Sequence, residues 1–422
     1  MLIRALQYRE VQCLTTWRIR RLRRRIEFSH GTLRTDSEFA TARIFDTTLR
    51  DGEQAPRTSF SYDDKRAIAA ALDGAGTHVI EAGFPVNGDA EFEAVSDIAT
   101  HTDATTCGLA RVVEKDVEAA LDSGVEMVHV FASTSEVQLA DSMHATREEV
   151  IERSVESIER VTETGTDVMF SPMDATRTDR DYLAEVVEAV SEAGVDWINI
   201  PDTCGVATPG RFADLVAFVG DHTDARIDVH THDDFGLASA NALAGFEAGA
   251  DQAQVSVTGI GERAGNAAFE QVVMAAESVY GADTGIDTTN ISAIAGMVES
   301  RSGVDTPPNA PVVGDNAFAH ESGIHAAGVM ENSATFEPGV MTPEMVGAER
   351  EFVLGKHTGT NSVRKRLEEI GFEPTDSEVR AVTREVKDTG ATGERITDDR
   401  LASFARDHGV DPERETVTEG RA

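Results

Sequence analysis

The sequence predicts an α/β fold, a (β/α)8 TIM barrel followed by a linker and a small helical C-terminal subdomain. Three observations support this: the length of 422 residues, an evenly spaced strand–helix rhythm, and a Gly- and Pro-rich stretch after it. A chain of this length is too long for one small domain but suits a barrel with an extension. Hydrophobic residues make up 40% of the chain, which is enough for a large core.

The strand–helix rhythm recurs roughly every 25–30 residues from position 43 to about position 281, the spacing of a (β/α)8 barrel. Each unit begins with a short apolar, β-branched run, and most units continue into a helical pattern. The expected strands are Arg43–Asp46, His78–Ala82, Ala104–Leu109, Met127–Phe131, Asp167–Phe170, Trp197–Ile200, Arg226–His230 and Gln254–Val257. Expected helices include Asp63–Asp73, Arg147–Thr164, Asp181–Ala193 and Ala238–Ala248. A doubly wound open sheet is the alternative, but it would seldom need eight evenly spaced strands.

Five segments are expected along the chain. Residues 41–284 form the barrel, and 285–330 form a linker subdomain that carries His325. Residues 331–410 form the helical subdomain, with helical patterns over Asp376–Asp388 and Thr397–His408, and 411–422 form a polar tail. Residues 1–40 form a basic arm. We expect that arm to be disordered, or to be an upstream stretch included by a mis-assigned translation start.

Charge separates the arm from the rest of the chain. The first 35 residues hold nine Arg and two Glu, a net charge of +7 that leaves −44 for the rest of a chain totalling −37. No apolar stretch follows the Arg cluster, which argues against a signal peptide, whereas a transit peptide stays an alternative. The acidic body repels phosphates and excludes a general nucleic-acid binder. It favours a solvated acidic surface suited to high salt.

The location expected for the protein is the cytoplasm. No run of about 18 apolar residues exists, so no membrane span and no membrane partner are predicted. The three cysteines, Cys13, Cys107 and Cys204, are too widely spaced for a disulfide framework and fit a reducing compartment.

Two polar motifs follow expected strands. Arg50 and Asp51 come directly after the first strand, where a carboxylate can hold a divalent metal and an Arg can stabilise an enolate oxygen. His230 and His232 end the seventh strand, and residues i and i+2 of a strand point to the same side, so both imidazoles can reach one cation. A solvated ion pair and a polar turn are the alternatives for the two motifs taken singly.

Two further segments are rich in chemistry. The turn after the eighth strand contains Gly259, Gly261 and Gly265; loops at this position often receive phosphate groups, and Gly allows close backbone approach. The segment Ala319-His320-Glu321-Ser322-Gly323-Ile324-His325 carries two His residues, and a surface helix would explain it equally well if it stood alone.

Together, RDGEQ after strand 1, HxH after strand 7 and GxGERxGN after strand 8 resemble the DRE-TIM metallolyase superfamily. Within it they look like the group of 2-isopropylmalate, citramalate and homocitrate synthases, and the resemblance runs from about residue 43 to about residue 370. Three motifs in barrel order are a highly specific signal. The implied reaction is a condensation of acetyl-CoA with a 2-keto acid, followed by thioester hydrolysis.

The resemblance implies a role for each matching residue. A divalent metal (Mn, Mg, Zn or Co) would be held by Asp51, His230, His232 and Asn266, with positions left open for the keto acid. The residues implied to be catalytic are Arg50 at the oxyanion, Glu262 near the acetyl group and His325 in proton transfer at the acetyl methyl. Residues expected to bind substrate are Gln54, Glu81, His129, Ser171 and Thr203. The resemblance also implies a homodimer with shared active sites, because the His325 segment crosses to the partner barrel in the family.

The keto acid is less well defined. Gly83-Phe84-Pro85 and His129 match the isopropylmalate synthases and favour 2-ketoisovalerate, with pyruvate and 2-ketoglutarate as alternatives. Met173 stands where the family often has Glu, with Asp174 beside it, and Phe336 stands in place of a Tyr. These two departures are the only support for an inactive homologue. An acyl-CoA lyase is disfavoured because no Cys follows Cys204. No leucine-sensing regulatory domain is expected, and hence no feedback inhibition through one.

Overall fold

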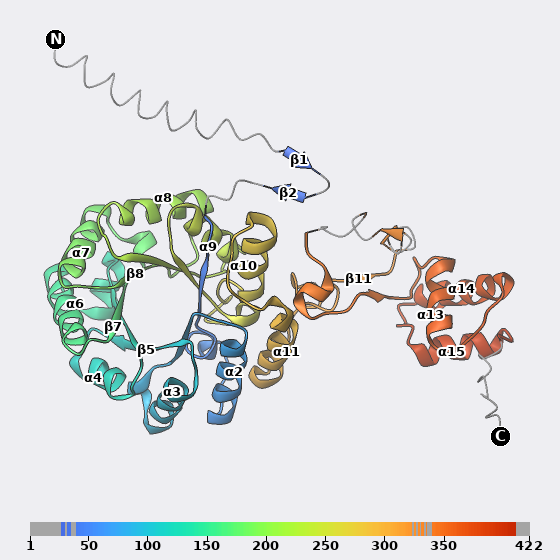
Figure 1. Cartoon of the computed structure of the whole chain (residues 1–422), viewed down its shortest axis with the longest axis horizontal. Helices are drawn as coiled ribbons and strands as arrows, with labels where there is room; N and C mark the ends of the chain where they lie inside the picture. Colours follow the sequence, from blue (N-terminus) through green and yellow to red (C-terminus); the bar gives the residue numbers. More distant parts are fainter. Residues whose placement is uncertain are drawn as a thin grey trace, which may run out of the picture.

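The computed structural model describes residues 27–29, 32–34, 39–322, 325, 328, 329, 331, 332, 335 and 340–410. Eight parallel strands close into a barrel in the order β10-β3-β4-β5-β6-β7-β8-β9 (Figure 1). The predicted TIM barrel is therefore confirmed. The strands are β3 (Arg43–Asp46), β4 (Val79–Gly83), β5 (Thr105–Arg111), β6 (Met127–Ser133), β7 (Asp167–Met173), β8 (Trp197–Asp202), β9 (Arg226–Thr231) and β10 (Gln252–Val255).

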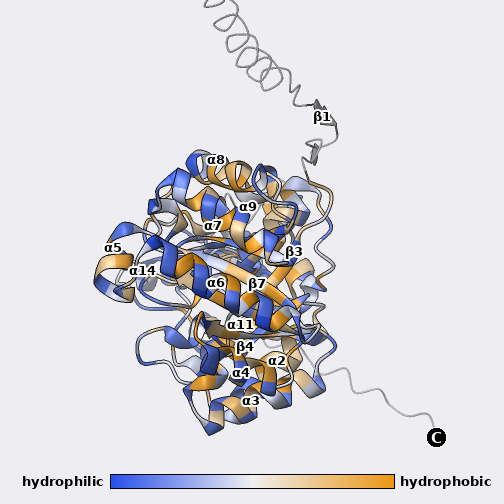
Figure 2. Cartoon of the chain, turned by 90° about the vertical axis from the view of Figure 1, so that its left-hand side faces the viewer, coloured by the Kyte–Doolittle hydropathy of each residue, from blue (hydrophilic) through white to orange (hydrophobic). Residues whose placement is uncertain are grey.

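Helices surround the barrel and leave its two ends open (Figure 1). Side chains along each strand point alternately into the barrel and towards the helices. The inward apolar residues form a small cluster that contains Phe45, Met169 and Trp197, and the outward ones belong to the large core under the helices. Figure 2 shows hydrophobic strands inside helices whose outer faces are hydrophilic. The helices of the repeat are α2 (Tyr62–Gly74), α3 (Asp89–His101), α4 (Glu114–Asp122), α6 (Arg147–Thr162), α7 (Arg180–Glu192), α8 (Pro209–Gly220), α9 (Ala238–Glu247) and α10 (Phe269–Ala275).

Several strands are longer than predicted. The pairing of β6 with β7 continues through Phe131↔Ser171 to Ser133↔Met173, beyond the apolar runs that marked these strands in the sequence. The ladder continues because backbone pairing in a closed barrel does not depend on side-chain polarity. The last strand instead begins earlier than predicted, at Gln252, and ends before Val257, which opens a short 3-10 turn.

The range predicted as a linker subdomain contains a helix that was not predicted, α11 (Ile291–Ser302). Ile291, Ile294 and Val298 recur on one helical face and join the barrel core. After α11 the chain continues beside the barrel, where Val312 and Phe318 still belong to its core cluster. It then reaches the short strand β11 (Ala319–His320), which pairs in parallel with β12 (Glu351–Phe352). The sequence analysis did not recognise the apolar spacing of α11 because it lies next to the Gly- and Pro-rich stretch.

A second hydrophobic core lies beyond this connection. It is built from α13 (Thr360–Glu369), which was not predicted, and from α14 (Asp376–Gly390) and α15 (Asp398–Asp407), which match the predicted helical patterns. This helical cluster lies beside the barrel in Figure 1, at the end of the extended connection. Its buried side chains, among them Leu367, belong to a cluster separate from that of the barrel.

Part of the basic arm also differs from the prediction. β1 (Glu27–Ser29) and β2 (Thr32–Arg34) pair as a short antiparallel hairpin within the arm expected to be disordered. The rest of the first 38 residues and the tail, 411–422, lie outside the described residues.

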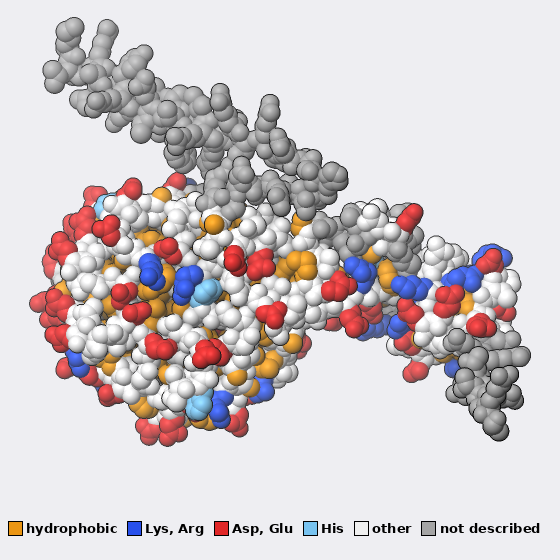
Figure 3. Space-filling view, viewed as in Figure 1, with side chains coloured by type: hydrophobic (Ala, Val, Ile, Leu, Met, Phe, Trp, Pro, Cys, Tyr) orange, Lys and Arg blue, Asp and Glu red, His pale blue; other side chains and the backbone are white. Residues whose placement is uncertain are grey.

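The surface of the described chain is strongly acidic. Figure 3 shows Asp and Glu side chains spread over the visible face of the barrel, with fewer Lys and Arg between them. Among the described residues, no helix combines the length and the apolar character that a membrane crossing requires.

The separation of the two cores generates a first prediction. Leu367→Ala removes a fully buried side chain from the second core and should cost about 2–5 kcal/mol of local stability. Hydrogen exchange followed by mass spectrometry should then be faster in α13, α14 and α15 and unchanged in the barrel strands. Leu72→Ala, a matched change in α2 against the barrel, should leave exchange in those three helices unchanged. Equal acceleration in barrel and cluster would show that the cores unfold together.

Candidate metal centre and active-site cavity

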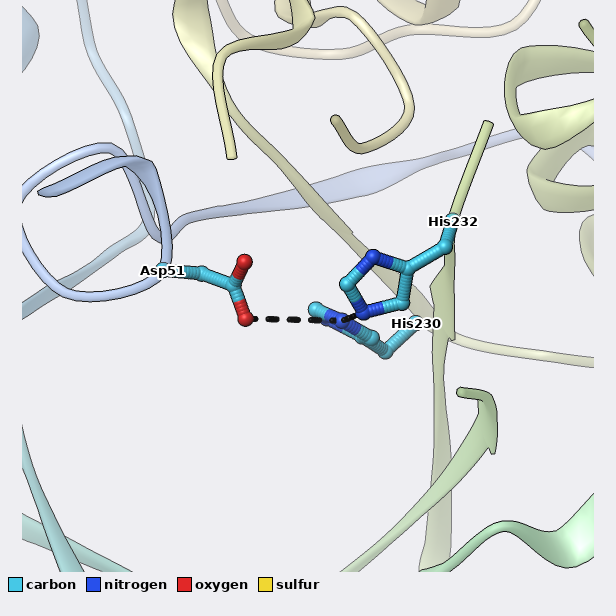
Figure 4. A group of neighbouring side chains, drawn as sticks. All are labelled: Asp51, His230 and His232. Carbon is cyan, nitrogen blue, oxygen red and sulfur yellow. Dashed lines mark hydrogen bonds and ion pairs between the residues drawn. The ribbon is translucent and has the colours of Figure 1, made fainter. Parts of the chain in front are cut away.

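Three potential metal ligands meet at the C-terminal edge of the barrel. Ligand atoms of Asp51, His230 and His232 all lie within 4.8 Å of one another, and all three residues are buried. The two Nε2 atoms of the histidines are 3.1 Å apart, and that of His230 is 3.8 Å from Asp51 Oδ2. Figure 4 shows the carboxylate facing both imidazoles across one small space.

Local backbone geometry explains this convergence. Asp51 lies in a tight turn after β3, where the N–H groups of Arg50, Asp51 and Gly52 all donate to the carbonyl of Thr47. His230 lies in β9, and His232 follows that strand and forms an isolated antiparallel bridge with Asn266. The bridge brings the fourth predicted ligand to the other three, and Asn266 Nδ2 lies 3.1 Å from Asp51 Oδ1.

The donor set fits a cation. Asn266 Oδ1 is buried and has no hydrogen-bond partner among the described residues, which is costly unless another group satisfies it. Two imidazole nitrogens that face each other, a carboxylate and an amide oxygen are ligands suited to Mn, Mg, Zn or Co. All four residues predicted as ligands therefore come together.

Electrostatics favour the protonation states that bind metals. Burial, reinforced by the neighbouring His232, lowers the pKa of His230 to about 3. Burial also lowers the pKa of His232. Burial alone would raise the pKa of Asp51, but Arg50 and the two histidines outweigh it and hold that pKa below its usual range. At neutral pH the site therefore presents two neutral imidazoles and a carboxylate, as metal binding requires.

The glycine-rich turn builds the metal centre. A Cβ on Gly261 would lie 2.3 Å from Asn266 Nδ2 and 3.1 Å from Asp51 Oδ1. Gly265 has a φ of +94°, and a Cβ there would lie 1.9 Å from the carbonyl oxygen of Gly259. The N–H groups of Gly259 and Gly265 donate within the turn, to Ser256 and Glu262. Two of the three glycines predicted to meet a phosphate thus use their N–H groups inside the loop.

Arg50 is held by a buried network. Its Nε donates to Glu81 Oε2 at 2.6 Å, and Nη1 donates to Asp51. Glu81 Oε1 lies 2.8 Å from His129 Nδ1, and His129 Nε2 lies 2.6 Å from Ser171 Oγ. Burial alone would raise the pKa of Glu81, but Arg50, followed by His129, lowers it to about 2. Glu81 was predicted to bind substrate, but it does not line the cavity and instead positions Arg50 and His129.

A cavity of about 290 Å³ opens above the metal ligands. It contains Arg50, His129 and Ser171 on its polar side. Its apolar wall is formed by Phe84, Leu109, Phe131, Met173 and Pro201. Leu109, Phe131 and Pro201 were not predicted as site residues. For Phe131 and Pro201 a signal was available, because each lies two residues from a predicted site residue, His129 and Thr203 respectively.

The neighbourhood of Met173 is informative about the pocket. Asp174 stands in a left-handed conformation, with a φ of +70°, and its buried carboxylate pairs with Arg177 at 2.6 Å. Asp174 therefore does not replace the charge that Glu would supply at position 173. Its backbone N–H donates to the Thr203 hydroxyl at 2.9 Å, which leaves the hydroxyl proton of Thr203 to donate into the cavity that it lines.

The remaining predicted residues divide into two groups. Gln54, at the end of the short helix after Asp51, and Glu262, in the glycine-rich turn, are exposed residues that line the cavity. His325 is exposed and does not line the cavity of its own barrel. Phe336 lies outside the described residues. Asn199 and Arg263 also line the cavity and were not predicted.

Comparison with known proteins agrees with this geometry. Residues 41–298 match the HMGL-like family, and residues 312–394 match the homocitrate synthase post-HMGL domain-like family. A probable 2-isopropylmalate synthase of Archaeoglobus fulgidus is 49% identical over 86% of this chain and 73% of its own length. The chain belongs to the HMGL-like/2-isopropylmalate synthase family. The family predicted from the three motifs is thereby confirmed.

Relatives of similar identity include proteins with other names. A putative (R)-citramalate synthase of Methanopyrus kandleri is 45% identical over 86% of this chain and 72% of its own length. Among solved structures, a hydroxymethylglutaryl-CoA lyase from Pseudomonas aeruginosa has a TM-score of 0.58 and 26% identity, covering 64% of this chain and 96% of that one. The comparisons thus agree on the family, and the relatives carry the names of two different synthases.

The crowding at Gly261 generates a second prediction. Gly261→Ala should displace Asn266 and weaken Mn²⁺ binding by about 10- to 100-fold, the range for changes beside metal ligands. Free Mn²⁺ measured by electron paramagnetic resonance during a titration checks this. Gly210→Ala, where a Cβ meets no atom within 4 Å, is the matched control and should bind Mn²⁺ as the unchanged protein does. Unchanged affinity in Gly261→Ala would remove Asn266 from the ligand set.

Proposed function

We propose that the protein is an acyltransferase that condenses acetyl-CoA with 2-ketoisovalerate to form 2-isopropylmalate, a reaction of leucine biosynthesis. The observation that supports this best is the group of four ligands beside a buried Arg, in a cavity with one apolar wall. Family membership supports the same class of chemistry, a carbon–carbon bond formed by transfer of an acyl group.

Arg50 and Thr203 would act on the keto acid. When bound, a divalent cation held by Asp51, His230, His232 and Asn266 polarises the keto carbonyl as a Lewis acid. Arg50 lines the cavity, and its Nη2 forms no hydrogen bond with any described residue, so it is placed to donate to the oxygen that gains negative charge. The Thr203 hydroxyl would donate to the substrate carboxylate.

Proton transfer completes the reaction. A base removes a proton from the acetyl methyl, the resulting carbon forms a bond to the keto carbon, and the keto oxygen takes up a proton to become a tertiary alcohol. Water then cleaves the thioester and releases CoA. We assign the proton transfer to His325 and a supporting role near the acetyl group to Glu262, which lines the mouth of the cavity.

A homodimer with shared sites accounts for the position of His325. This residue is exposed and does not line the cavity of its own barrel. A second copy related by two-fold symmetry would bring its own His325 segment to this barrel, and the reverse, as isologous interfaces require.

The side chain of the keto acid would lie on the apolar wall. Phe84, Leu109, Phe131 and Met173 offer only apolar groups and a thioether. The cationic groups nearby are engaged: Arg50 with two carboxylates, and Arg263 with Asp234. A second carboxylate, as in 2-ketoglutarate, would therefore be desolvated without a partner. Pyruvate is the second candidate, because a related chain bears the name of a citramalate synthase.

Substrate preference is the third prediction. In a thiol-release assay with acetyl-CoA, kcat/KM should be highest for 2-ketoisovalerate and lowest for 2-ketoglutarate. For pyruvate, kcat/KM should be lower by about 10- to 200-fold for each methyl-sized group of 2-ketoisovalerate that pyruvate lacks. Asp51→Ala should release no CoA with any keto acid, which controls for background hydrolysis. A preference for pyruvate would make the protein a citramalate synthase.

Subunit complementation is the fourth prediction. Asp51→Ala and His325→Ala should each be inactive alone. Refolded together, they should recover about one quarter of normal activity, because half of the dimers are mixed and each mixed dimer holds one intact site. Asp51→Ala mixed with His230→Ala should recover none, because each change inactivates the barrel of its own subunit and leaves no intact site in a mixed dimer. Activity in the first mixture no greater than in the second would exclude sharing of His325.

A further inference from the structure

A buried chain of hydrogen bonds lies beneath the candidate metal centre. Two of its three residues, Gln254 and Asp228, have no role in the proposed function. His230 Nδ1 lies 2.9 Å from Gln254 Oε1, and Gln254 Nε2 donates to Asp228 Oδ2 at 2.7 Å. Gln254 is the register neighbour of His230 on β10, and Asp228 lies two residues before His230 on β9. All three side chains point into the barrel and are at most 6% exposed.

The placement of the Gln254 amide gives the direction of both hydrogen bonds. Its Nε2, the only donor group of the side chain, donates to Asp228 Oδ2, so its oxygen faces His230. An amide oxygen accepts only, and the bond to His230 therefore needs a proton on Nδ1. In a neutral imidazole this leaves Nε2 with its lone pair, and Nε2 is the atom that faces Asp51 and His232.

We propose that Gln254 and Asp228 are positioning residues that hold His230 in the one tautomer and ring orientation able to bind the metal. The proposal rests on the metal centre of the proposed function and adds two residues to it. His232 provides the contrast within the same site, because its Nδ1 is buried without a hydrogen-bond partner among the described residues. The tautomer and ring orientation of His230 are thus fixed before a metal binds, whereas no hydrogen bond at Nδ1 fixes those of His232.

The matched variants are Gln254→Met and Gln254→Glu. Gln254→Met has a similar shape but leaves the Nδ1–H of His230 without its acceptor, whereas Gln254→Glu keeps an acceptor in place. Gln252→Met is the control: the same change, on the same strand and equally buried, at an amide that is the register partner of Asp228 and does not contact His230, so the hydrogen bond to His230 Nδ1 stays in place. The probe is Mn²⁺ alone, titrated without substrate, so the readout is independent of turnover.

Gln254→Met should weaken Mn²⁺ binding by about 10- to 100-fold, while Gln254→Glu and Gln252→Met stay close to the unchanged protein. A second readout is nitrogen-15 NMR of the histidine rings in the metal-free protein. It should show His230 protonated on Nδ1, and a mixture of tautomers in Gln254→Met. A purely structural role would weaken binding in Gln252→Met as well and would leave the tautomer unchanged.

Three results would overturn the proposal: Mn²⁺ affinity in a folded Gln254→Met equal to that of the unchanged protein, equal losses in Gln254→Met and Gln252→Met, or a His230 ring protonated on Nε2 in the metal-free unchanged protein. The last result does not depend on whether Gln254→Met folds. Failure of the proposed function has a different signature, because the unchanged protein would then show no Mn²⁺-dependent release of CoA with any keto acid.

Discussion

The closure of eight parallel strands is the constraint on which the site depends. Parallel strands all end at one edge, so residues separated by about half of the chain meet there. Asp51 follows β3 and His230 lies in β9, yet their side chains face each other across the barrel mouth. The backbone bridge between His232 and Asn266 brings the turn after β10 next to these two residues. No local segment could assemble this donor set alone.

Burying charges at this edge requires that each one be compensated. Arg50 lies between the carboxylates of Asp51 and Glu81, and each carboxylate has further partners. The desolvation cost of any one of these groups would be several kcal/mol if it stood alone. Their pairing allows an ionised site at the mouth of a barrel whose interior apolar cluster includes Phe45, Met169 and Trp197. The same pairing holds Arg50 in one orientation, which oxyanion stabilisation needs.

The barrel and the convergence of Asp51, His230, His232 and Asn266 could be predicted from the sequence because both leave local marks. Apolar runs at even spacing mark the strands, and Asp51, His230, His232 and Asn266 each belong to a short motif. The positioning residues Gln254 and Asp228 leave no such mark, since their role arises only from register between β9 and β10. Glu81 was predicted to bind substrate, and the sequence does not show that both its oxygens are already bonded, to Thr47, Arg50 and His129. Helix α11 was missed because the apolar spacing of Ile291, Ile294 and Val298 lies beside a Gly- and Pro-rich stretch.

Two buried networks approach the centre from opposite sides. Glu81 and His129 hold Arg50, and Asp228 and Gln254 hold His230. Both use inward positions on their strands, so these polar residues orient the groups proposed to act on the keto acid. Recognition of the substrate side chain is left to the next inward positions on β5, β6 and β7, which carry Leu109, Phe131 and Met173. Because these apolar side chains are not among the groups that hold the four candidate ligands in place, substitutions there are expected to alter which keto acid fits while the ligands keep their arrangement.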